Sequence, residues 1–353
     1  MRQRHRKNTE IKRGSADFVR RFRLRWRLIA STVIVLWAIW TLLDAFVIPK
    51  DIVEAGAAAG HTIEETATAD TGGRAASADA SDPASDPHKV PEEENDEEVT
   101  AYAEPVITEN SYEDGMTSIQ IYTMRTHDTT VYIADIELSD PSCLRTALAY
   151  NSFGRNLTDT TSSMAQQHDA ILAINGDYYG FRERGYVMRS GFLYRSEAAN
   201  DPEQEDLVLY PDGSMAIVRE SEISAKQLAQ GGASEIFSFG PGLITDGQIK
   251  VSSDDEVERA QVTNPRTAIG LLSPLHYIFL VSDGRTKESK GLSLLELAEL
   301  MQDLGCVTAY NLDGGGSSTF WFNGRVLNRP TTYGKQIEER SISDIVYIGQ
   351  PQR

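Results

Sequence analysis

The chain has 353 residues, with 34 Lys/Arg, 52 Asp/Glu and two cysteines. A formal net charge of −18 argues against a nucleic-acid-binding protein, because such proteins must neutralise phosphates. Two cysteines are too few for a disulfide-rich scaffold. In an exported domain Cys143 and Cys306 could pair, or each could be a buried free thiol.

The N-terminal part is basic and then strongly apolar. Residues 1–49 carry 11 Lys/Arg and 3 Asp/Glu, a net charge of +8, and residues 28–48 contain one charged residue, Asp44. At about 1.5 Å per residue this stretch reaches roughly 31 Å, enough to cross a bilayer core. It predicts a transmembrane helix over 28–48 that follows a basic cytoplasmic segment, 1–27. The rest would then lie outside the cytoplasm, attached to the cell membrane by a single pass. A cleaved signal peptide is the alternative, although its apolar region is usually shorter.

The next segment is acidic and poor in large apolar residues. Residues 50–105 carry 3 Lys/Arg and 15 Asp/Glu, a net charge of −12. Such a composition buries too little apolar surface to offset the entropy of ordering the chain. We therefore expect a disordered acidic linker over 49–105. The remaining residues, 106–353, have 20 Lys/Arg and 34 Asp/Glu, a net of −14, and suffice for one domain with a large core.

Strand patterns dominate this domain. Residues 118–124 and 130–138 alternate in polarity as half-buried strands do. Residues 170–174 and 277–281 are continuous apolar runs, which indicates strands buried on both faces. Three hairpins are expected at turns that contain Asp212-Gly213, Asp246-Gly247 and Asn323-Gly324, because these pairs supply positive φ angles.

Helices are fewer. Ser293 and Glu296 form a capping-box pattern before apolar residues at helical spacing, and Gly305 suits the C-terminal cap. Weaker helix patterns cover residues 157–168 and 224–230. The expected fold class is α+β, with a mixed, largely antiparallel sheet and a few packed helices.

A run of three glycines is the most unusual local feature. Asp313 precedes Gly314, Gly315 and Gly316, and two hydroxyl residues, Ser317 and Ser318, follow. Consecutive glycines suit a backbone that turns sharply and approaches another group closely. The segment offers a carboxylate, backbone N–H groups and hydroxyls to an oxygen-rich ligand such as a sugar or a phosphate. A Walker-type nucleotide loop would need a lysine before the hydroxyl residue, and none is present.

Other polar corners also adjoin apolar segments. Asn175 to Asp177 follow the run 170–174, Asp283 and Arg285 follow 277–281, and Arg266 opens a further apolar segment. If these corners converge, they place two guanidinium groups beside several carboxylates. Arginine binds a phosphodiester through paired charge-assisted hydrogen bonds, and a carboxylate can assist attack at an electrophilic carbon.

The chain resembles the phosphodiester glycosidase family. The resemblance is carried by Asn175-Gly-Asp-Tyr-Tyr179, Asn264-Pro-Arg-Thr-Ala-Ile-Gly270, Ser282-Asp-Gly-Arg285, Tyr310-Asn-Leu-Asp-Gly-Gly-Gly-Ser-Ser-Thr319 and Glu339-Arg-Ser-Ile-Ser-Asp344. It implies a glycosidase that releases a sugar from a sugar-1-phosphodiester, with these corners lining one pocket. Two motifs depart from the family pattern, at Tyr178-Tyr179 and at Ser341-Ile342, so the substrate cannot be carried over.

We assign provisional roles on this basis. Asp313 is the first candidate for the catalytic carboxylate at the anomeric carbon, and Asp177 is the second. The expected substrate-binding residues are Arg266 and Arg285 on the phosphate, Asn175 and Asn311 on sugar hydroxyls, and Asp283, Gly314, Gly315, Gly316, Ser317 and Ser318. Each has a structural alternative. Arg266 could pair with a buried aspartate, Asp177 could cap a turn, Asp283 could belong to an ordinary turn, and Asp313 could hold the glycine run in shape.

No cofactor is expected, because no His/Cys group has the spacing of a zinc site. Asp254, Asp255 and Glu256 could bind Ca²⁺ weakly, but a solvated loop is the simpler interpretation. The sequence favours a membrane-anchored, extracytoplasmic glycosidase that hydrolyses sugar-1-phosphodiester linkages. Its expected partner is the substrate, a phosphate-linked envelope glycan or exopolysaccharide. The alternatives are a non-catalytic phosphoglycan-binding protein and a structural envelope protein.

Overall fold

The computed structural model describes residues 31–41, 43–44, 47–48, 50–55, 104–255, 263–333 and 336–351. Residues 31–41 are helical, and no helix among the described residues is both long and apolar enough to cross a bilayer. The predicted segment 1–27, part of the predicted span 28–48 and most of the predicted linker lie outside the described residues.

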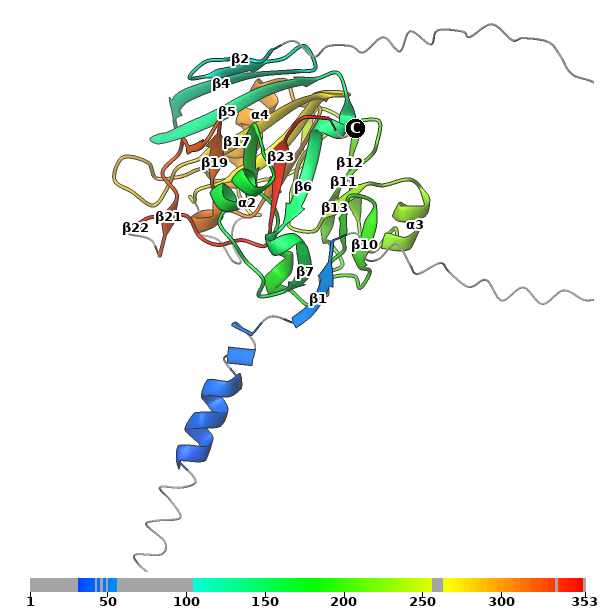
Figure 1. Cartoon of the computed structure of the whole chain (residues 1–353), viewed down its shortest axis with the longest axis vertical. Helices are drawn as coiled ribbons and strands as arrows, with labels where there is room; N and C mark the ends of the chain where they lie inside the picture. The colour runs from blue at the N-terminus through cyan, green and yellow to red at the C-terminus, as the bar shows by residue number, and fades with distance from the viewer. Residues whose placement is uncertain are drawn as a thin grey trace, which may run out of the picture.

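The largest sheet has nine strands in the order β15-β14-β18-β16-β17-β5-β4-β3-β2. Figure 1 shows β2, β4 and β5 along one side of the domain. The bounds are β2 (Val106–Ile107), β3 (Ser111–Glu113), β4 (Thr117–Thr126), β5 (Thr129–Leu138), β14 (Gly242–Thr245), β15 (Gln248–Ile249), β16 (Thr267–Ser273), β17 (His276–Ser282) and β18 (Thr308–Leu312).

Among the described residues, two five-stranded sheets and two strand pairs complete the β structure. One sheet has the order β20-β19-β8-β23-β6 and the other β10-β9-β13-β11-β12, while β1 pairs with β7 and β21 with β22. The bounds are β1 (Lys50–Glu54), β6 (Leu144–Leu148), β7 (Ser152–Arg155), β8 (Leu172–Asn175), β9 (Val187–Arg189), β10 (Phe192–Arg195), β11 (Glu205–Leu209), β12 (Met215–Arg219), β13 (Glu235–Phe237), β19 (Phe320–Phe322), β20 (Arg325–Val326), β21 (Thr331–Thr332), β22 (Gln336–Ile337) and β23 (Asp344–Ile348).

The core lies between the sheets, and helices cover their outer faces. Along β5, Ala134 and Ile136 join the central core, whereas Val131 and Ile133 face α4 (Leu294–Asp303). Helix α2 (Thr161–Gln167) packs on the β8–β23 sheet, and α3 (Ala225–Gln230) packs on the β9–β13–β11 sheet (Figure 1). The 3₁₀ turns are η2 (Pro141–Cys143), η3 (Ala149–Asn151), η4 (Tyr179–Phe181) and η5 (Gly315–Ser317).

Most local predictions are confirmed. The described strand pairs are antiparallel, the three predicted hairpins form as β11–β12, β14–β15 and β19–β20, and α4 begins with the predicted capping box. Helix α2 starts later than the pattern suggested, because the Thr160 side chain accepts the first cap hydrogen bond from Ser163 N–H. Cys143 and Cys306 are both buried and unpaired.

One segment differs from its prediction. Residues 50–54, at the start of the predicted linker, form β1 and pair antiparallel with β7 (Figure 1). The β-branched pair Ile52-Val53 within this acidic stretch favours a strand. The unpaired edge of β7 supplies its hydrogen-bonding partner.

The strand register brings several polar corners to one edge of the sheets. Thr267 at the start of β16 lies opposite Leu312 at the end of β18 and opposite Val281 near the end of β17. Ile345 near the start of β23 lies opposite Asn175 at the end of β8. Asp313 follows the end of β18, and Asp344 is the first residue of β23. The pairing of these strand ends therefore brings both carboxyl groups to the same edge.

Candidate functional site

Asp313 and Arg340 form an ion pair beside the glycine run. Arg340 Nη2 lies 2.8 Å from Asp313 Oδ2, and the Ser317 hydroxyl donates to the same oxygen at 2.5 Å. Arg340 also donates through Nε to Ser317 Oγ at 2.9 Å. Asp313 is almost fully buried, whereas the Arg340 side chain is 40% exposed. The guanidinium is thus anchored on one side and remains open to solvent on the other.

Arg285 approaches the same loop from the end of β17. Its Nε and Nη2 atoms donate to Asn264 Oδ1 at 3.1 and 3.0 Å. A Cβ atom built on Gly315 would lie 2.8 Å from Arg285 Nη2, and one built on Gly316 would lie 3.5 Å from Arg340 Cβ. Both arginines therefore flank η5, and glycine at position 315 permits the close approach of Arg285. Gly315 also has a φ angle of +65°, which favours glycine.

The segment that carries Arg340 is fixed to α2. Glu339 accepts hydrogen bonds from the backbone N–H and the hydroxyl of Ser162, at 3.0 and 2.5 Å. Asp159 and Ile342 form an isolated antiparallel bridge on the other side of Arg340. These contacts place Arg340 over the glycine run although 26 residues separate it from Gly314 in the chain.

The electrostatics of this group favour an anion. Arg285, Arg340 and Asp313 together carry a net charge of +1. Burial lowers the pKa of Arg285, and the positive charge of Arg340 lowers it further. Burial raises the pKa of Asp313, while Arg340 and Ser317 oppose that rise by stabilising the carboxylate. Two mutually repelling guanidinium groups beside one carboxylate are stabilised when an anion binds between them.

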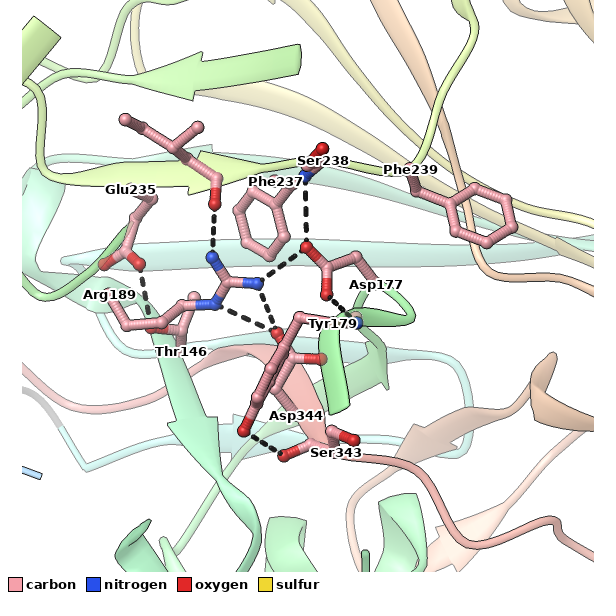
Figure 2. Close-up of polar contacts among 12 residues, drawn as sticks. Thr146, Asp177, Tyr179, Arg189, Glu235, Phe237, Ser238, Phe239, Ser343 and Asp344 are labelled. Atoms are coloured by element: carbon pink, nitrogen blue, oxygen red, sulfur yellow. Dashed lines mark hydrogen bonds and ion pairs between the residues drawn. The ribbon is translucent and has the colours of Figure 1, made fainter. Parts of the chain in front are cut away.

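Asp177 belongs to a different, deeply buried cluster around Arg189. Arg189 Nη2 lies 3.0 Å from Asp177 Oδ2 and 2.6 Å from Asp344 Oδ2. Its Nε atom donates to Asp344 Oδ2 at 2.9 Å, and the centre of its guanidinium lies 4.0 Å from the Phe237 ring centroid. Figure 2 shows Arg189 enclosed by these groups, with Glu235 nearby and bonded to Thr146.

The cluster has three carboxyl groups for one guanidinium. The pKa values of two of these carboxyl groups are raised. Burial raises the pKa of Asp344 to about 8, although the attraction of Arg189 opposes the rise. Burial also raises the pKa of Glu235 to about 7, again against the effect of Arg189. Asp344 Oδ1 is buried and has no hydrogen-bond partner among the described residues. At neutral pH these pKa values leave Asp344 mostly protonated and Glu235 partly protonated.

Asp177 is fully engaged within the protein. Oδ1 accepts from Tyr179 N–H at 2.9 Å, and Oδ2 accepts from Ser238 N–H at 3.1 Å in addition to Arg189 (Figure 2). The turn-capping alternative raised by the sequence therefore has direct structural support.

The Arg189 cluster adjoins the Asp313 group through Gly176. A Cβ on Gly176 would lie 2.4 Å from Asp344 Oδ1, and Gly176 O accepts from Asp313 N–H at 3.3 Å.

The two predicted asparagines are also buried. Asn175 donates to Asp313 O at 2.6 Å and accepts from the Thr267 hydroxyl at 2.7 Å, so it ties three strand ends together. Asn311 donates to Gly240 O at 2.8 Å, while its Oδ1 atom has no partner among the described residues. These contacts favour a supporting role for Asn175, and contact of either side chain with a sugar stays a prediction.

Arg266 and Asp283 lie beside the group without joining its ion pair. Arg266 Nε donates to Leu292 O at 2.9 Å, and its Cα atom lies 3.9 Å from the position of a Cβ on Gly314. Asp283 Oδ1 accepts from Arg329 N–H at 2.7 Å, and burial raises the pKa of Asp283. Arg266 therefore adjoins the glycine run through its backbone, with at least one guanidinium donor bound to a carbonyl.

The glycine run is more closed than the sequence suggests. Gly315 N–H donates to Pro265 O at 2.8 Å, so this N–H group already has a partner inside the protein. Ser317 and Ser318 are fully buried, and Ser318 Oγ has no partner among the described residues. The loop shapes the site and orients Asp313, while the exposed charge comes from Arg285 and Arg340.

Sequence reasoning assigned no role to Arg340, Arg189 or Asp344. Arg340 and Asp344 both lie in the last motif that carries the family resemblance, which was the available signal. Arg189 lies in a short strand without a distinctive pattern. In the part of the chain that the structure describes, no group of three or more His, Cys, Asp or Glu side chains could hold a metal ion. Glu256, in the weak Ca²⁺ hypothesis, lies outside that part.

Comparison with known proteins decides the family. Residues 168–349 match the phosphodiester glycosidase family, and this range contains Asp177, Arg285, Asp313 and Arg340. The chain belongs to the phosphodiester glycosidase family. The resemblance drawn from the motifs is therefore confirmed.

Individual relatives match different shares of the chain. It is 31% identical over 204 residues to the SPbeta prophage-derived uncharacterized protein YomE of Bacillus subtilis, covering 56% of this chain and 31% of that protein. It is 32% identical over 124 residues to mouse N-acetylglucosamine-1-phosphodiester α-N-acetylglucosaminidase, covering 31% of this chain and 24% of the enzyme. The matched regions thus span less than a third of these curated relatives.

Solved structures share the fold of this glycosidase-family domain. The zebrafish N-acetylglucosamine-1-phosphodiester α-N-acetylglucosaminidase catalytic domain, auto-inhibited by its pro-peptide, matches with a TM-score of 0.53 and 20% identity. That match covers 66% of this chain and 83% of the zebrafish chain. A hypothetical protein from Synechocystis matches with a TM-score of 0.52 and 15% identity, covering 67% of this chain and 62% of the other.

Proposed function

We propose that this protein hydrolyses the bond between the anomeric carbon of a sugar and the phosphate oxygen of a sugar-1-phosphodiester. The observation that carries the proposal is the pairing of Asp313 with Arg340, with Arg285 close to the same glycine loop. Two guanidinium groups can bind a phosphodiester while the carboxylate lies beside the bond to be broken. Membership of the phosphodiester glycosidase family supports the same reaction.

The arginines and the Asp313 carboxylate have different roles in the reaction. Water adds to the anomeric carbon and loses one proton, and the bond from that carbon to the phosphate oxygen breaks. The phosphomonoester leaves with the bonding electrons and takes up a proton from solvent, which balances the one lost by water. Arg285 and Arg340 stabilise the charge that develops on the departing phosphate, as preorganised cations do in other sites. Because a phosphomonoester is a better leaving group than an alkoxide, this step depends less on a strong general acid.

Asp313 is the carboxylate assigned to the anomeric carbon. Its ionised form is stabilised by Arg340 and by the Ser317 hydroxyl, which counteract the effect of burial on its pKa. A carboxylate at this position can stabilise the positive charge that develops on the sugar ring in the transition state. Asp177 is the weaker candidate, because Arg189, Ser238 and Tyr179 already bind both of its oxygens.

The cellular setting is a further part of the proposal. The apolar stretch 28–48, preceded by a basic segment, supports a single-pass membrane anchor with the folded domain outside the cytoplasm. A phosphate-linked envelope glycan or exopolysaccharide is the corresponding substrate. The folded part has a net charge of −14, so it repels polyanions in general. An anionic substrate must therefore bind through the local positive group of Arg285 and Arg340.

A non-catalytic phosphoglycan-binding protein is the second candidate. It is favoured by the tight bonding of Asp313 Oδ2 to Arg340 and Ser317, which a purely structural carboxylate would also show. This candidate requires the same two arginines to bind phosphate but predicts no turnover.

A screen against a panel of sugar-1-phosphodiesters, with and without a chelator, tests the two candidates. The wild-type chain should release free sugar from at least one panel member, and Asp313→Asn should lower kcat by roughly a hundredfold or more. Asp303→Asn, on the exposed face of α4, serves as the matched control and should leave the rate unchanged. Phosphodiester binding without any sugar release would favour the second candidate.

A further inference from the structure

One strand of the β21–β22 hairpin is fixed beside Arg285. The Thr331 hydroxyl donates to Gly284 O at 3.0 Å, and Gly284 directly precedes Arg285 in the chain. Thr331 is buried, and the backbone that leads into it is held where Arg329 N–H donates to Asp283 Oδ1 at 2.7 Å. Figure 1 shows β21 and β22 side by side at the margin of the domain. The base of the hairpin is therefore attached to the segment that carries the first arginine.

The same hairpin is fixed beside Arg340. The Thr332 hydroxyl donates to Glu338 O at 2.7 Å, which closes the hairpin above its base. A Cβ atom built on Gly316 would lie 3.2 Å from Thr332 Oγ1 and 3.5 Å from Arg340 Cβ. Arg340 N–H donates to Gly316 O at 3.3 Å. Gly316 therefore lies between the hairpin and Arg340, and the two arginines and the hairpin form one connected unit.

Tyr333 extends from this unit into solvent. It follows β21 directly, and it is 88% exposed. No hydrogen bond, ion pair or ring contact joins its side chain to another described residue. Its φ angle is +53°, a conformation that bulky side chains rarely adopt. An unfavourable backbone conformation of this kind persists where the surrounding structure imposes it, often at a ligand site.

The order of contacts places Tyr333 beyond the phosphate. Asp313 contacts Arg340, Arg340 adjoins Gly316, and Gly316 adjoins Thr332, which precedes Tyr333. In the proposed reaction the carboxylate lies at the anomeric carbon and Arg340 lies at the phosphate. The next group along this row is the alcohol that is esterified to the phosphate, the half of the substrate that leaves with it.

The surroundings of Tyr333 select the chemistry of that alcohol. An exposed tyrosine ring packs well against the apolar face of a sugar ring while its hydroxyl stays in water. Gln336 and Glu338 on the same hairpin are exposed polar residues, and Ile337 between them is 49% exposed. The amide and carboxylate suit hydroxyl groups, and the negative charge of Glu338 disfavours an acidic group.

We infer that Tyr333 contacts a neutral sugar unit in the alcohol half of the phosphodiester and so determines specificity for a glycan on that side. This inference rests on the proposed function, because it assigns the two halves of the substrate from the roles of Asp313 and Arg340. It adds a selectivity that the proposed reaction alone does not require.

Three diesters of one sugar-1-phosphate measure this selectivity. The phosphate would be esterified with methanol, with O6 of methyl glucoside or with 1-octanol, on the sugar-1-phosphate of the panel that the full-length chain cleaves fastest. We expect kcat/KM for the glucoside diester to exceed that for the methyl diester by about tenfold, equivalent to roughly 1.4 kcal/mol. A higher kcat/KM for the octyl diester than for the glucoside diester would overturn the inference, because the site would then prefer an apolar chain.

Variants of exposed tyrosines locate the contact. Tyr333→Asn removes the ring and suits the left-handed backbone, so it should fold and lose most of the preference for the glucoside diester. Tyr333→Phe keeps the ring and should retain most of that preference. Tyr150→Asn is the matched control, because Tyr150 is 60% exposed at a φ angle of +58°, and its preference should equal that of the wild type. Equal preferences in the wild type and Tyr333→Asn, or equal losses in both asparagine variants, would overturn the inference.

Binding measurements separate this inference from the proposed hydrolysis. If no panel member is cleaved, calorimetry would compare the methyl and glucoside diesters of glucose 1-phosphate. Tighter binding of the glucoside diester, lost in Tyr333→Asn, would support the contact although hydrolysis had failed. Equal binding of both diesters, or binding of neither, would overturn it. Cleavage of the two diesters with equal kcat/KM would refute this inference alone and leave the proposed hydrolysis intact.

Discussion

Arg340 Nη2 contacts Asp313 Oδ2 at 2.8 Å, so the carboxylate at the end of β18 is paired with a cation from the segment that leads into β23. The two side chains differ in exposure: the carboxylate is buried, and the guanidinium is half-exposed. This arrangement lets one arginine support the ionised carboxylate and present its remaining donors to an incoming anion. Substitutions of Arg340 and Gly315 separate anion binding from simple stabilisation of the fold.

Replacement of Arg340 should affect the reaction more than the fold. Arg340→Gln removes a cation that contacts Asp313 and that, in the proposed reaction, binds the phosphate, so we expect kcat/KM to fall roughly a hundredfold or more. Arg340→Lys should recover only part of the loss, because lysine cannot reproduce the planar pair of donors. Steady-state kinetics and thermal unfolding on the same samples provide the measurement. An unchanged kcat/KM in Arg340→Gln would contradict the assigned role.

The approach of Arg285 to Gly315 can be tested with a matched pair of glycines. Gly315→Ala places a methyl group 2.8 Å from Arg285 Nη2 at a φ angle of +65°, whereas Gly247→Ala meets no atom within 4 Å at +70°. Both variants should lose about 1 kcal/mol of stability from backbone strain. Only Gly315→Ala should also lose phosphodiester affinity, because Arg285 must move. Equal affinity in both variants would show that the position of Arg285 is unimportant.

The Arg189 cluster should be essential for stability. Arg189→Met leaves Asp177 and Asp344 buried without their cation, and we expect a loss of about 4 kcal/mol in the free energy of unfolding. Arg219→Met is the control, because Arg219 is exposed and its contacts with Glu203 and Glu205 are 3.6 and 3.7 Å long. Its loss should be about 0.5 kcal/mol. Urea unfolding measures both, and similar losses would contradict a structural role for the cluster.

The raised carboxyl pKa values predict a specific dependence of stability on pH. Glu235 titrates near pH 7 in the folded protein, against 4.5 for an ordinary glutamate. Between these values the folded state binds more protons than the unfolded state, so Glu235 lowers the free energy of unfolding progressively as pH rises. Asp344, with its pKa raised to about 8, has the same sign over a wider range.

A difference measurement isolates the contribution of Glu235. The gap in unfolding free energy between Glu235→Gln and the wild type should shift in favour of the variant by about 3 kcal/mol from pH 4.5 to 7.5. His168 has a pKa lowered by burial and works in the opposite direction, but its effect cancels in the difference. Glu109→Gln, at an exposed position, should show no such shift. A constant gap for Glu235→Gln would refute the raised pKa.

Local features were predictable because they depend on near neighbours in the chain. Asn323 and Gly324 have φ angles of +42° and +85°, as their hairpin turn requires. Ser293 and Glu296 cap α4 as their spacing indicates. The partner of Asp177 was not predictable, since Arg189 reaches it only through the packing of β9 against β13 and β23. The contact of Arg340 with Asp313 was not predictable either, because it depends on how the segment before β23 packs beside the end of β18.

Cleavage in water enriched in ¹⁸O tests the central claim most directly. The wild-type chain would be given a defined sugar-1-phosphodiester, and both products would be examined by mass spectrometry. If Asp313 and the two arginines act as proposed, the label enters the anomeric hydroxyl of the released sugar and the phosphomonoester stays unlabelled. Label in the phosphate would show that the phosphorus–oxygen bond breaks instead, and the assignment of Asp313 to the anomeric carbon would then be wrong.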